Sequence, residues 1–134
     1  MNPRPSVARF ARGIVRAEAA RGGAGDDGEI AQRVLTRLHQ ELGKLIGPAG
    51  LDVLLARSVV LARRAHPVLV GVTAGPGGKL AHTDDVARDR IGLQEGSVAI
   101  ISQFIELLVM LIGEDLGFRL VGDIWPAAAK EETK

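Results

Sequence analysis

Two segments of this chain share a pattern typical of helical hairpins: an apolar helix-like stretch, the tripeptide Leu-Ile-Gly, and a second apolar stretch. The tripeptide occupies residues 45–47 and 111–113. Before its first copy, an apolar seam alternates spacings of four and three, as in a heptad: Ala31, Leu35, Leu38, Leu42 and Leu45. Pro48 then suits the first position of a new helix. The pattern predicts two helical hairpins packed as a four-helix bundle, and a duplication is one possible origin of the echo.

Further helices are predicted on both sides of these corners. Residues 6–20 carry one apolar stripe, with arginines opposite: Val7, Phe10, Ala11, Ile14 and Val15. The segment 48–65 is apolar around most of its circumference, so we expect it to be buried on more than one side. Residues 97–113 form a very apolar helix, and 114–125 form a last amphipathic helix ended by Pro126.

The region 68–83 does not have a helical pattern. Val68–Thr73 is β-branched and the following Gly-Pro-Gly-Gly is a turn signal, so we expect a long loop or a short hairpin. Asp84 or Asp85 can begin a short helix that runs to Ile91.

The fold prediction is therefore an all-α bundle of four to five helices, built from two hairpins plus an N-terminal helix. The 134 residues fit one domain. We divide it into a basic N-terminal helix (6–20), a Gly-rich linker (21–28), the bundle (29–125) and a frayed tail (126–134).

Composition excludes several classes of site. The chain has no cysteine, which removes disulfides, thiolate metal sites and cysteine nucleophiles. Aromatic residues are only 3% of the chain, too few for a platform that stacks single-stranded nucleic acid. We expect no cofactor.

We do not expect a membrane-spanning helix. Val98–Ile112 contains twelve apolar residues, interrupted by Ser102, Gln103 and Glu106, whereas a span needs about twenty. The N-terminal segment lacks a continuous apolar core, so it does not resemble a secretory signal, although it would suit a mitochondrial presequence in a eukaryote. The usage of Ala, Arg and Gly suggests a bacterial protein, and we expect it in the cytoplasm.

Positive charge is concentrated in the N-terminal part. Residues 1–64 contain eleven Lys or Arg and six Asp or Glu, whereas residues 65–134 contain six and ten. The first helix and its flanks have five arginines against one glutamate. This helix can contact an acidic surface, or its arginines can form a solvated face.

His39 is a candidate phosphorylation site. Gly43 follows it by one helical turn, and Lys44 and Gly50 lie nearby. These residues partly resemble histidine phosphotransfer domains, in which an exposed helical histidine carries the phosphoryl group and a glycine one turn later admits a receiver domain. In that family the lysine usually precedes the glycine, and the histidine lies further from the helix end. The alternative is a histidine at the rim of the core, with a ring nitrogen in water.

Three other patterns match functional motifs incompletely. The loop Gly75–Lys79 lacks the first Gly and the final Ser or Thr of a phosphate-binding loop. The segment His82–Asp89 has metal-binding residue types without a known spacing, and helix capping and surface charge explain them, so we expect no metal. Arg57, Arg63 and Arg64 follow a helical corner, but their helix is too apolar to read a DNA groove. We therefore expect no specific nucleic-acid binding.

Polar residues on the most apolar segment form a separate candidate. Gln103 and Glu106 lie one turn apart, with Ser102 beside them. This stripe can face solvent or a partner arginine, or it can fix the register of a helix–helix interface. Neither Glu106 nor any other carboxylate has a visible catalytic partner in the sequence.

The sequence thus favours a non-enzymatic regulatory or adaptor module that acts by helix–helix association, as a homodimer. The candidate interface residues are Ile101, Phe104, Ile105, Leu108, Ile112 and Trp125. Ordinary core packing is the alternative for each. Two other functions remain open: phosphotransfer through His39, and binding of a small apolar ligand between the two most apolar helices.

Overall fold

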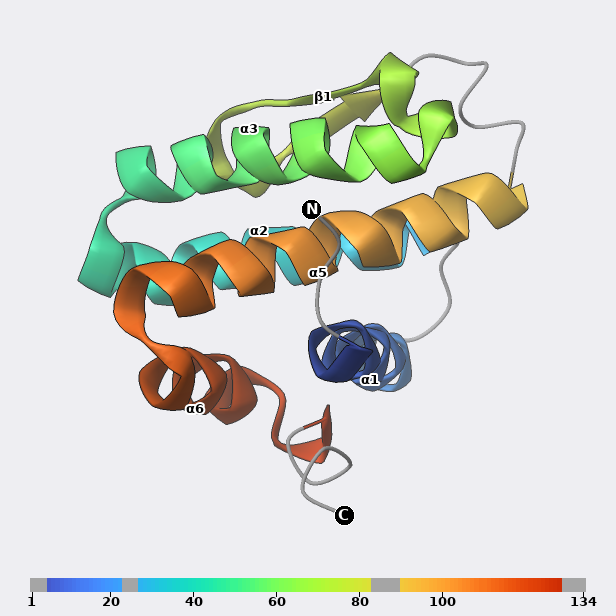
Figure 1. Ribbon diagram of the computed structural model, residues 1–134. Coiled ribbons are helices and arrows are strands. Elements are labelled where there is room, and N and C mark those ends of the chain that lie inside the picture. Colours follow the sequence, from blue (N-terminus) through green and yellow to red (C-terminus); the bar gives the residue numbers. More distant parts are fainter. Residues whose placement is uncertain (1–4, 23–26, 83–89, 129–134) are drawn as a thin grey trace.

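The computed structural model describes residues 5–22, 27–82 and 90–128, and the predicted all-α bundle is confirmed (Figure 1). In the described chain five long helices form it: α1 (Pro5–Gly22), α2 (Asp27–Ile46), α3 (Pro48–Ala65), α5 (Arg90–Ile112) and α6 (Glu114–Ile124). The hairpins α2–α3 and α5–α6 pack together, and α1 crosses them at an angle (Figure 1). Helix α5 is central, since it contacts each of the other four.

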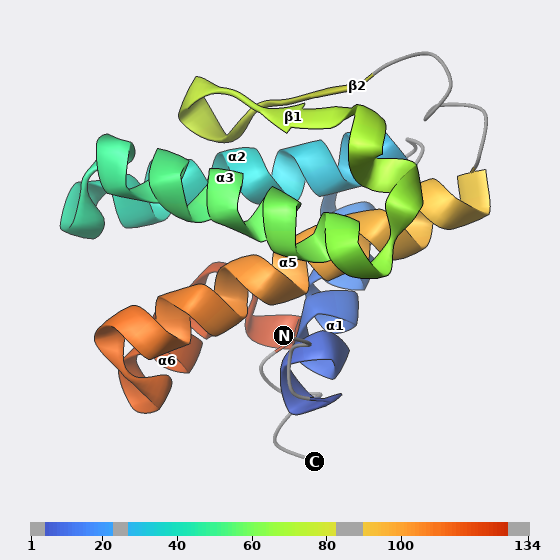
Figure 2. The ribbon, with the colours of Figure 1, turned by 45° about the horizontal axis from the view of Figure 1, so that its top comes forward.

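The region between α3 and α5 contains a β-hairpin, so the hairpin alternative for this loop is confirmed. Strands β1 (Val72–Ala74) and β2 (Leu80–His82) pair antiparallel, with Thr73 opposite Ala81. The 3₁₀ turn η2 (Pro76–Gly78) joins them. Figure 2 shows the hairpin above α2 and α3.

The apolar residues that precede β1 do not extend the strand as their β-branched character suggested. They form the 3₁₀ turn η1 (Pro67–Gly71). Pro67 follows the end of α3, and the Leu69 N–H donates to the His66 carbonyl at 2.9 Å. This turn directs Leu69, which is fully buried, into the core.

The Leu-Ile-Gly echo extends to backbone geometry. Gly47 and Gly113 both have φ 96°, with ψ 143° and 154°, so both corners need the left-handed region that glycine adopts readily. The second helix of each hairpin also ends alike. His66 and Trp125 have φ −130° and −128°, and a proline follows each. The two hairpins therefore have the same backbone conformation at the corner glycine and at the residue that ends the second helix.

Most of the predicted apolar stripes lie in one continuous core. On α1, Val15 is half-buried and the other four stripe residues are buried. On α2, the seam is buried through Leu42, but Leu45 is 67% exposed, contrary to prediction. A straight helix drifts by about 20° per heptad relative to a 3.5-residue repeat. Two heptads after Ala31 the seam has turned away from its neighbours.

Helix α3 has the predicted bounds but is not covered all round. Leu51, Leu55 and Val59 form its buried face, whereas Val53 and Val60, seven residues apart, are 69% and 40% exposed on the outer face. Helix α3 packs against α2, α5 and the hairpin region, so the prediction that it is buried on more than one side is confirmed, and this outer face is the part left exposed.

Helix α5 begins seven residues earlier than predicted, at Arg90. The short helix expected from Asp84 or Asp85 falls mostly outside the described residues, and Arg90 and Ile91 belong to α5. By length and composition, the stretch Glu95–Ile112 is apolar enough to cross a membrane, with a mean hydropathy of 1.8. Within the bundle, 56% of this stretch is buried. A core helix of a soluble protein meets the same criterion.

The helices and the described C-terminal residues extend into segments that the prediction left outside the bundle. Helix α1 reaches Gly22 and α2 begins at Asp27, so both ends of the predicted linker are helical, and residues 23–26 lie outside the described residues. Residues 126–128, which the prediction placed in the tail, belong to the described chain. The Ala128 N–H donates to the Trp125 carbonyl at 3.1 Å, and Ala128 is buried. Residues 129–134 lie outside the described chain.

Candidate functional site

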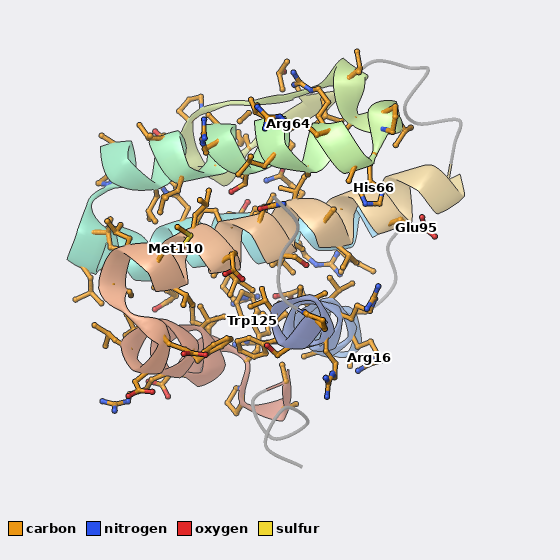
Figure 3. All side chains as sticks on the ribbon, in the orientation of Figure 1. Arg16, Arg64, His66, Glu95, Met110 and Trp125 are labelled. Carbon is orange, nitrogen blue, oxygen red and sulfur yellow. The ribbon has the colours of Figure 1, made fainter. Side chains whose placement is uncertain are left out.

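A partly open groove of about 770 Å³ lies between α1, α3 and α5. Helix α1 lines it with one face, α3 with its last turn, and α5 with its N-terminal half. The lining residues are Ala8, Arg12, Val15, Arg16, Ala62, Ala65, His66, Glu95, Val98, Ala99, Ser102 and Gln103. Figure 3 labels Arg16 on α1, His66 directly after the end of α3, and Glu95 on α5.

The groove exists because small side chains meet where the three helices approach one another. Ala8, Ala62, Ala65 and Ala99 supply four of its twelve lining positions. Elsewhere, the same α5 helix fills the space between its neighbours with large side chains such as Phe104. Alanine leaves a space that a larger aliphatic residue would occupy.

His66 is held at the mouth of the groove by its backbone. Its N–H donates to the Ala62 carbonyl at 2.9 Å, and its own carbonyl accepts from the Leu69 N–H. Pro67 restricts the conformation of the residue before it. His66 is half-buried and is one of the lining residues of the groove.

His39, the candidate phosphorylation site, lies elsewhere. Its side chain is 16% exposed, and its Nε2 is 3.0 Å from Asp52 Oδ1 on α3. The same carboxylate oxygen accepts a hydrogen bond from the Gly77 N–H at 3.2 Å. Gly43, the matching small residue of the family pattern, instead faces Leu51 of α3. His39 therefore links α2, α3 and the hairpin turn through Asp52.

The glycine-rich turn, considered above as a phosphate loop, is fastened to α2. Gln32 donates to the Gly78 carbonyl at 2.9 Å and accepts from the Leu80 N–H at 2.8 Å. A Cβ on Gly78 would lie 2.7 Å from the Leu35 carbonyl oxygen, so only glycine allows this approach. The backbone of the turn thus packs directly against α2.

Arg63 fastens the other end of the hairpin region. Its guanidinium donates to the carbonyls of Leu69 at 3.4 Å and Val72 at 2.9 Å. Of the three arginines considered for DNA binding, Arg63 therefore bonds to the backbone of the hairpin region, whereas Arg57 and Arg64 are exposed.

A buried ionic cluster around Glu18 was missed by the sequence analysis. The Glu18 side chain is fully buried and accepts hydrogen bonds from Arg37 at 2.8 and 3.3 Å and from Trp125 Nε1 at 3.2 Å. Arg33 Nε lies 3.8 Å from Glu18 Oε2. A signal was present: Glu18 is the one glutamate of α1 and continues its apolar stripe four residues after Ile14.

Two opposing effects set the pKa of Glu18. Burial raises it, because a charged carboxylate loses its hydration. The hydrogen bonds from Arg37 and Trp125, together with the positive charges of Arg37 and Arg21, outweigh burial and lower it below its usual value. The same contact raises the pKa of Arg37. Both groups are therefore charged at neutral pH.

The polar stripe on α5 points inward rather than to solvent at two of its three positions. Ser102 and Gln103 are 2% and 4% exposed, and both line the groove. The Ser102 hydroxyl donates to the Val98 carbonyl at 2.7 Å, on its own helix. Glu106 is half-buried.

Five of the six residues proposed for an association surface are core residues of the bundle, as the core-packing alternative has it. Ile101, Phe104, Ile105, Leu108 and Trp125 are each no more than 3% exposed. Ile112 is half-buried against the same core. The assignment of these side chains to a surface is therefore corrected: they are already covered by α1, α2, α3 and α6.

Large apolar residues are instead exposed around the two Leu-Ile-Gly corners. We call Leu45, Met110, Leu111 and Leu116 the corner surface; they are 67%, 63%, 61% and 44% exposed. Both corners lie at the same end of the bundle (Figures 1 and 2). The corner surface combines side chains from α2, α5 and α6.

Within the described residues, no group of three or more His, Asp or Glu side chains is arranged to hold a metal ion. The predicted segment of mixed donors lies mostly outside the described chain, since only His82, at the end of β2, belongs to a described element.

Comparison with known proteins does not place the chain in a group. No family model matches it, and neither does a curated protein or a solved structure. The chain is therefore assigned by its fold alone, as a helical bundle of two hairpins and a crossing helix. Its function has to be inferred from its surfaces.

Proposed function

We propose that this protein is a non-enzymatic regulatory or adaptor module that works by helix–helix association, as a homodimer. The observation that carries the proposal is the corner surface, where four large apolar side chains are exposed at one end of the bundle. A concentration of exposed apolar residues with a polar rim is typical of a protein–protein interface.

The rim of the corner surface has the polar character that an interface needs. Lys44 and Glu41 lie beside Leu45 and are 75% and 50% exposed. Glu114 and Asp115 begin α6 on the other side and are exposed. A two-fold axis can bring the corner surfaces of two copies together with the same residues on each side.

The polar groups of the described residues support a non-enzymatic role. Glu18, Gln32, His39 and Arg63 each bond between elements of the fold. We also propose a cytoplasmic location, because 56% of the apolar stretch Glu95–Ile112 is buried inside the bundle, as in the core helix of a soluble protein.

The test is the molar mass in solution by light scattering, over a hundredfold range of concentration. We expect a mass near twice 14.1 kDa for the native chain. Replacing both Met110 and Leu111 with Gln should give monomers. Val70→Gln is the matched control, because Val70 is 68% exposed on η1, at the opposite end of the bundle (Figure 1).

Two outcomes would contradict the proposal. A native chain that is monomeric at every concentration rules out self-association. A dimer that persists in the double variant places the interface elsewhere. Circular dichroism of both variants checks that the helices remain folded.

A further inference from the structure

The groove between α1, α3 and α5 is separate from the corner surface. Two of its lining residues, His66 and Glu95, lie toward the end of the bundle opposite the two corners (Figure 3). We propose that this groove binds a small amphipathic anion, with a carboxylate-type head group and an aliphatic body. The proposal does not depend on self-association.

The size of the groove suits such a ligand. Ligand pockets in proteins have volumes of roughly 300–1,000 Å³, and the groove measures about 770 Å³. Its lining includes the apolar side chains of Val15, Ala62, Val98 and Ala99. An aliphatic chain that enters the groove covers this apolar surface and removes it from water, which lowers the free energy of the complex.

The charge of the groove selects the head group. Arg12 and Arg16 lie one helical turn apart on the α1 wall. Among the lining residues that the structure describes, Glu95 is the one carboxylate. Two permanently charged guanidinium groups against one carboxylate favour an anion, and arginine binds a carboxylate through two parallel hydrogen bonds.

Buried polar groups provide a second determinant beside the apolar lining residues. The side chains of Ser102 and Gln103 are almost fully buried, yet both line the groove. Because the Ser102 hydroxyl already donates to its own helix, its oxygen can only accept from a ligand. A hydroxyl or amide N–H on a ligand can donate to that oxygen, and decanoate, which carries neither on its chain, tests the head group and the aliphatic body alone.

The experiment is calorimetric titration of the full chain with sodium decanoate below its micellar concentration. Two probes separate the contributions: acetate has the head without the chain, and decyltrimethylammonium has the chain with a positive head. We expect one decanoate per chain, at least tenfold weaker binding of decyltrimethylammonium, and no measurable binding of acetate.

Variants place the ligand in the groove. Arg12→Gln should weaken decanoate binding about tenfold, as expected for loss of a charge-assisted pair. Arg9→Gln is the matched control, because Arg9 is exposed on α1 outside the groove. Ala99→Phe should fill part of the groove and abolish binding. Amide shifts in NMR should cluster at Ala8, Ala62 and Ala99.

Each contrary result overturns the proposal. Absence of decanoate binding to the native chain removes it. Equal binding of both ten-carbon probes refutes an anion site. Equal effects of Arg9→Gln and Arg12→Gln indicate general attraction to the basic helix. Since Arg12 is exposed, its variant tests the site even if Ala99→Phe does not fold. A monomeric native chain would leave these results unchanged.

Discussion

Trp125 donates a hydrogen bond from Nε1 to Oε1 of Glu18 at 3.2 Å, across 107 positions of sequence. The same carboxylate accepts two hydrogen bonds from Arg37, so it joins α1, α2 and the residue that follows α6. Arg21 of α1 adds a hydrogen bond to the Ile124 carbonyl at 3.2 Å. These contacts hold the C-terminal end of α6, and Trp125 after it, against α1.

The first prediction concerns the Glu18 cluster. Glu18→Gln should lower the free energy of unfolding by about 1.5–3 kcal/mol, because it weakens hydrogen bonds to a charged group. Trp125→Phe should cost about 0.5–1.5 kcal/mol, because the carboxylate keeps Arg37. Urea unfolding measures both. Glu41→Gln is the control: Glu41 is a half-exposed carboxylate on α2, and its loss should cost less than about 1 kcal/mol.

The second prediction is a pH dependence with a defined sign. The pKa of Glu18 is lower in the folded protein than its ordinary value of 4.5, so the unfolded chain takes up a proton first as the pH falls. The stabilisation by Glu18 is complete above that value and is lost as the pH falls through the folded pKa. The stability difference between the native chain and Glu18→Gln should therefore shrink below pH 4.5. A difference that stays constant from pH 7 to pH 3 would contradict this assignment.

The third prediction concerns the hairpin. Gln32→Ala removes the acceptor of the Leu80 N–H and the donor to the Gly78 carbonyl, and both are partly buried. We expect a loss of about 1–3 kcal/mol and faster hydrogen exchange at the Leu80 amide. Gln40→Ala, on the exposed face of the same helix, should leave both unchanged. If the Leu80 amide exchanges at its native rate in Gln32→Ala, the hairpin is held by other contacts.

The fourth prediction addresses His39. Incubation with phosphoramidate should leave His39 unmodified, because its ring is mostly covered and its Nε2 is bonded to Asp52. Phosphorus NMR detects phosphohistidine, and His39→Gln provides the blank spectrum. A phosphohistidine signal in the native chain that is absent from His39→Gln would instead revive the phosphotransfer function.

Local chemistry in the sequence was sufficient for most of the secondary structure. The bounds of α3 were predicted to the residue, because Pro48 begins the helix and Pro67 follows its last turn. The Gly-Pro-Gly-Gly turn and the corner glycines were recognised for a similar reason: backbone conformation there depends on single residues. The apolar stripe of α1 followed from the 3.6-residue period of a helix.

Tertiary structure decided which face of each helix meets another element. Leu45 fits the seam of α2 yet is exposed, and Phe104 and Trp125, proposed for an interface, lie in the core. The Glu18–Trp125 pair, the His39–Asp52 contact and the groove each join residues from different helices. The 3.6-residue period of a helix depends on residues that are close in the sequence, so the sequence of one segment is enough to predict its apolar stripe. Contacts between helices depend on packing and crossing direction, which the packing of the whole chain determines.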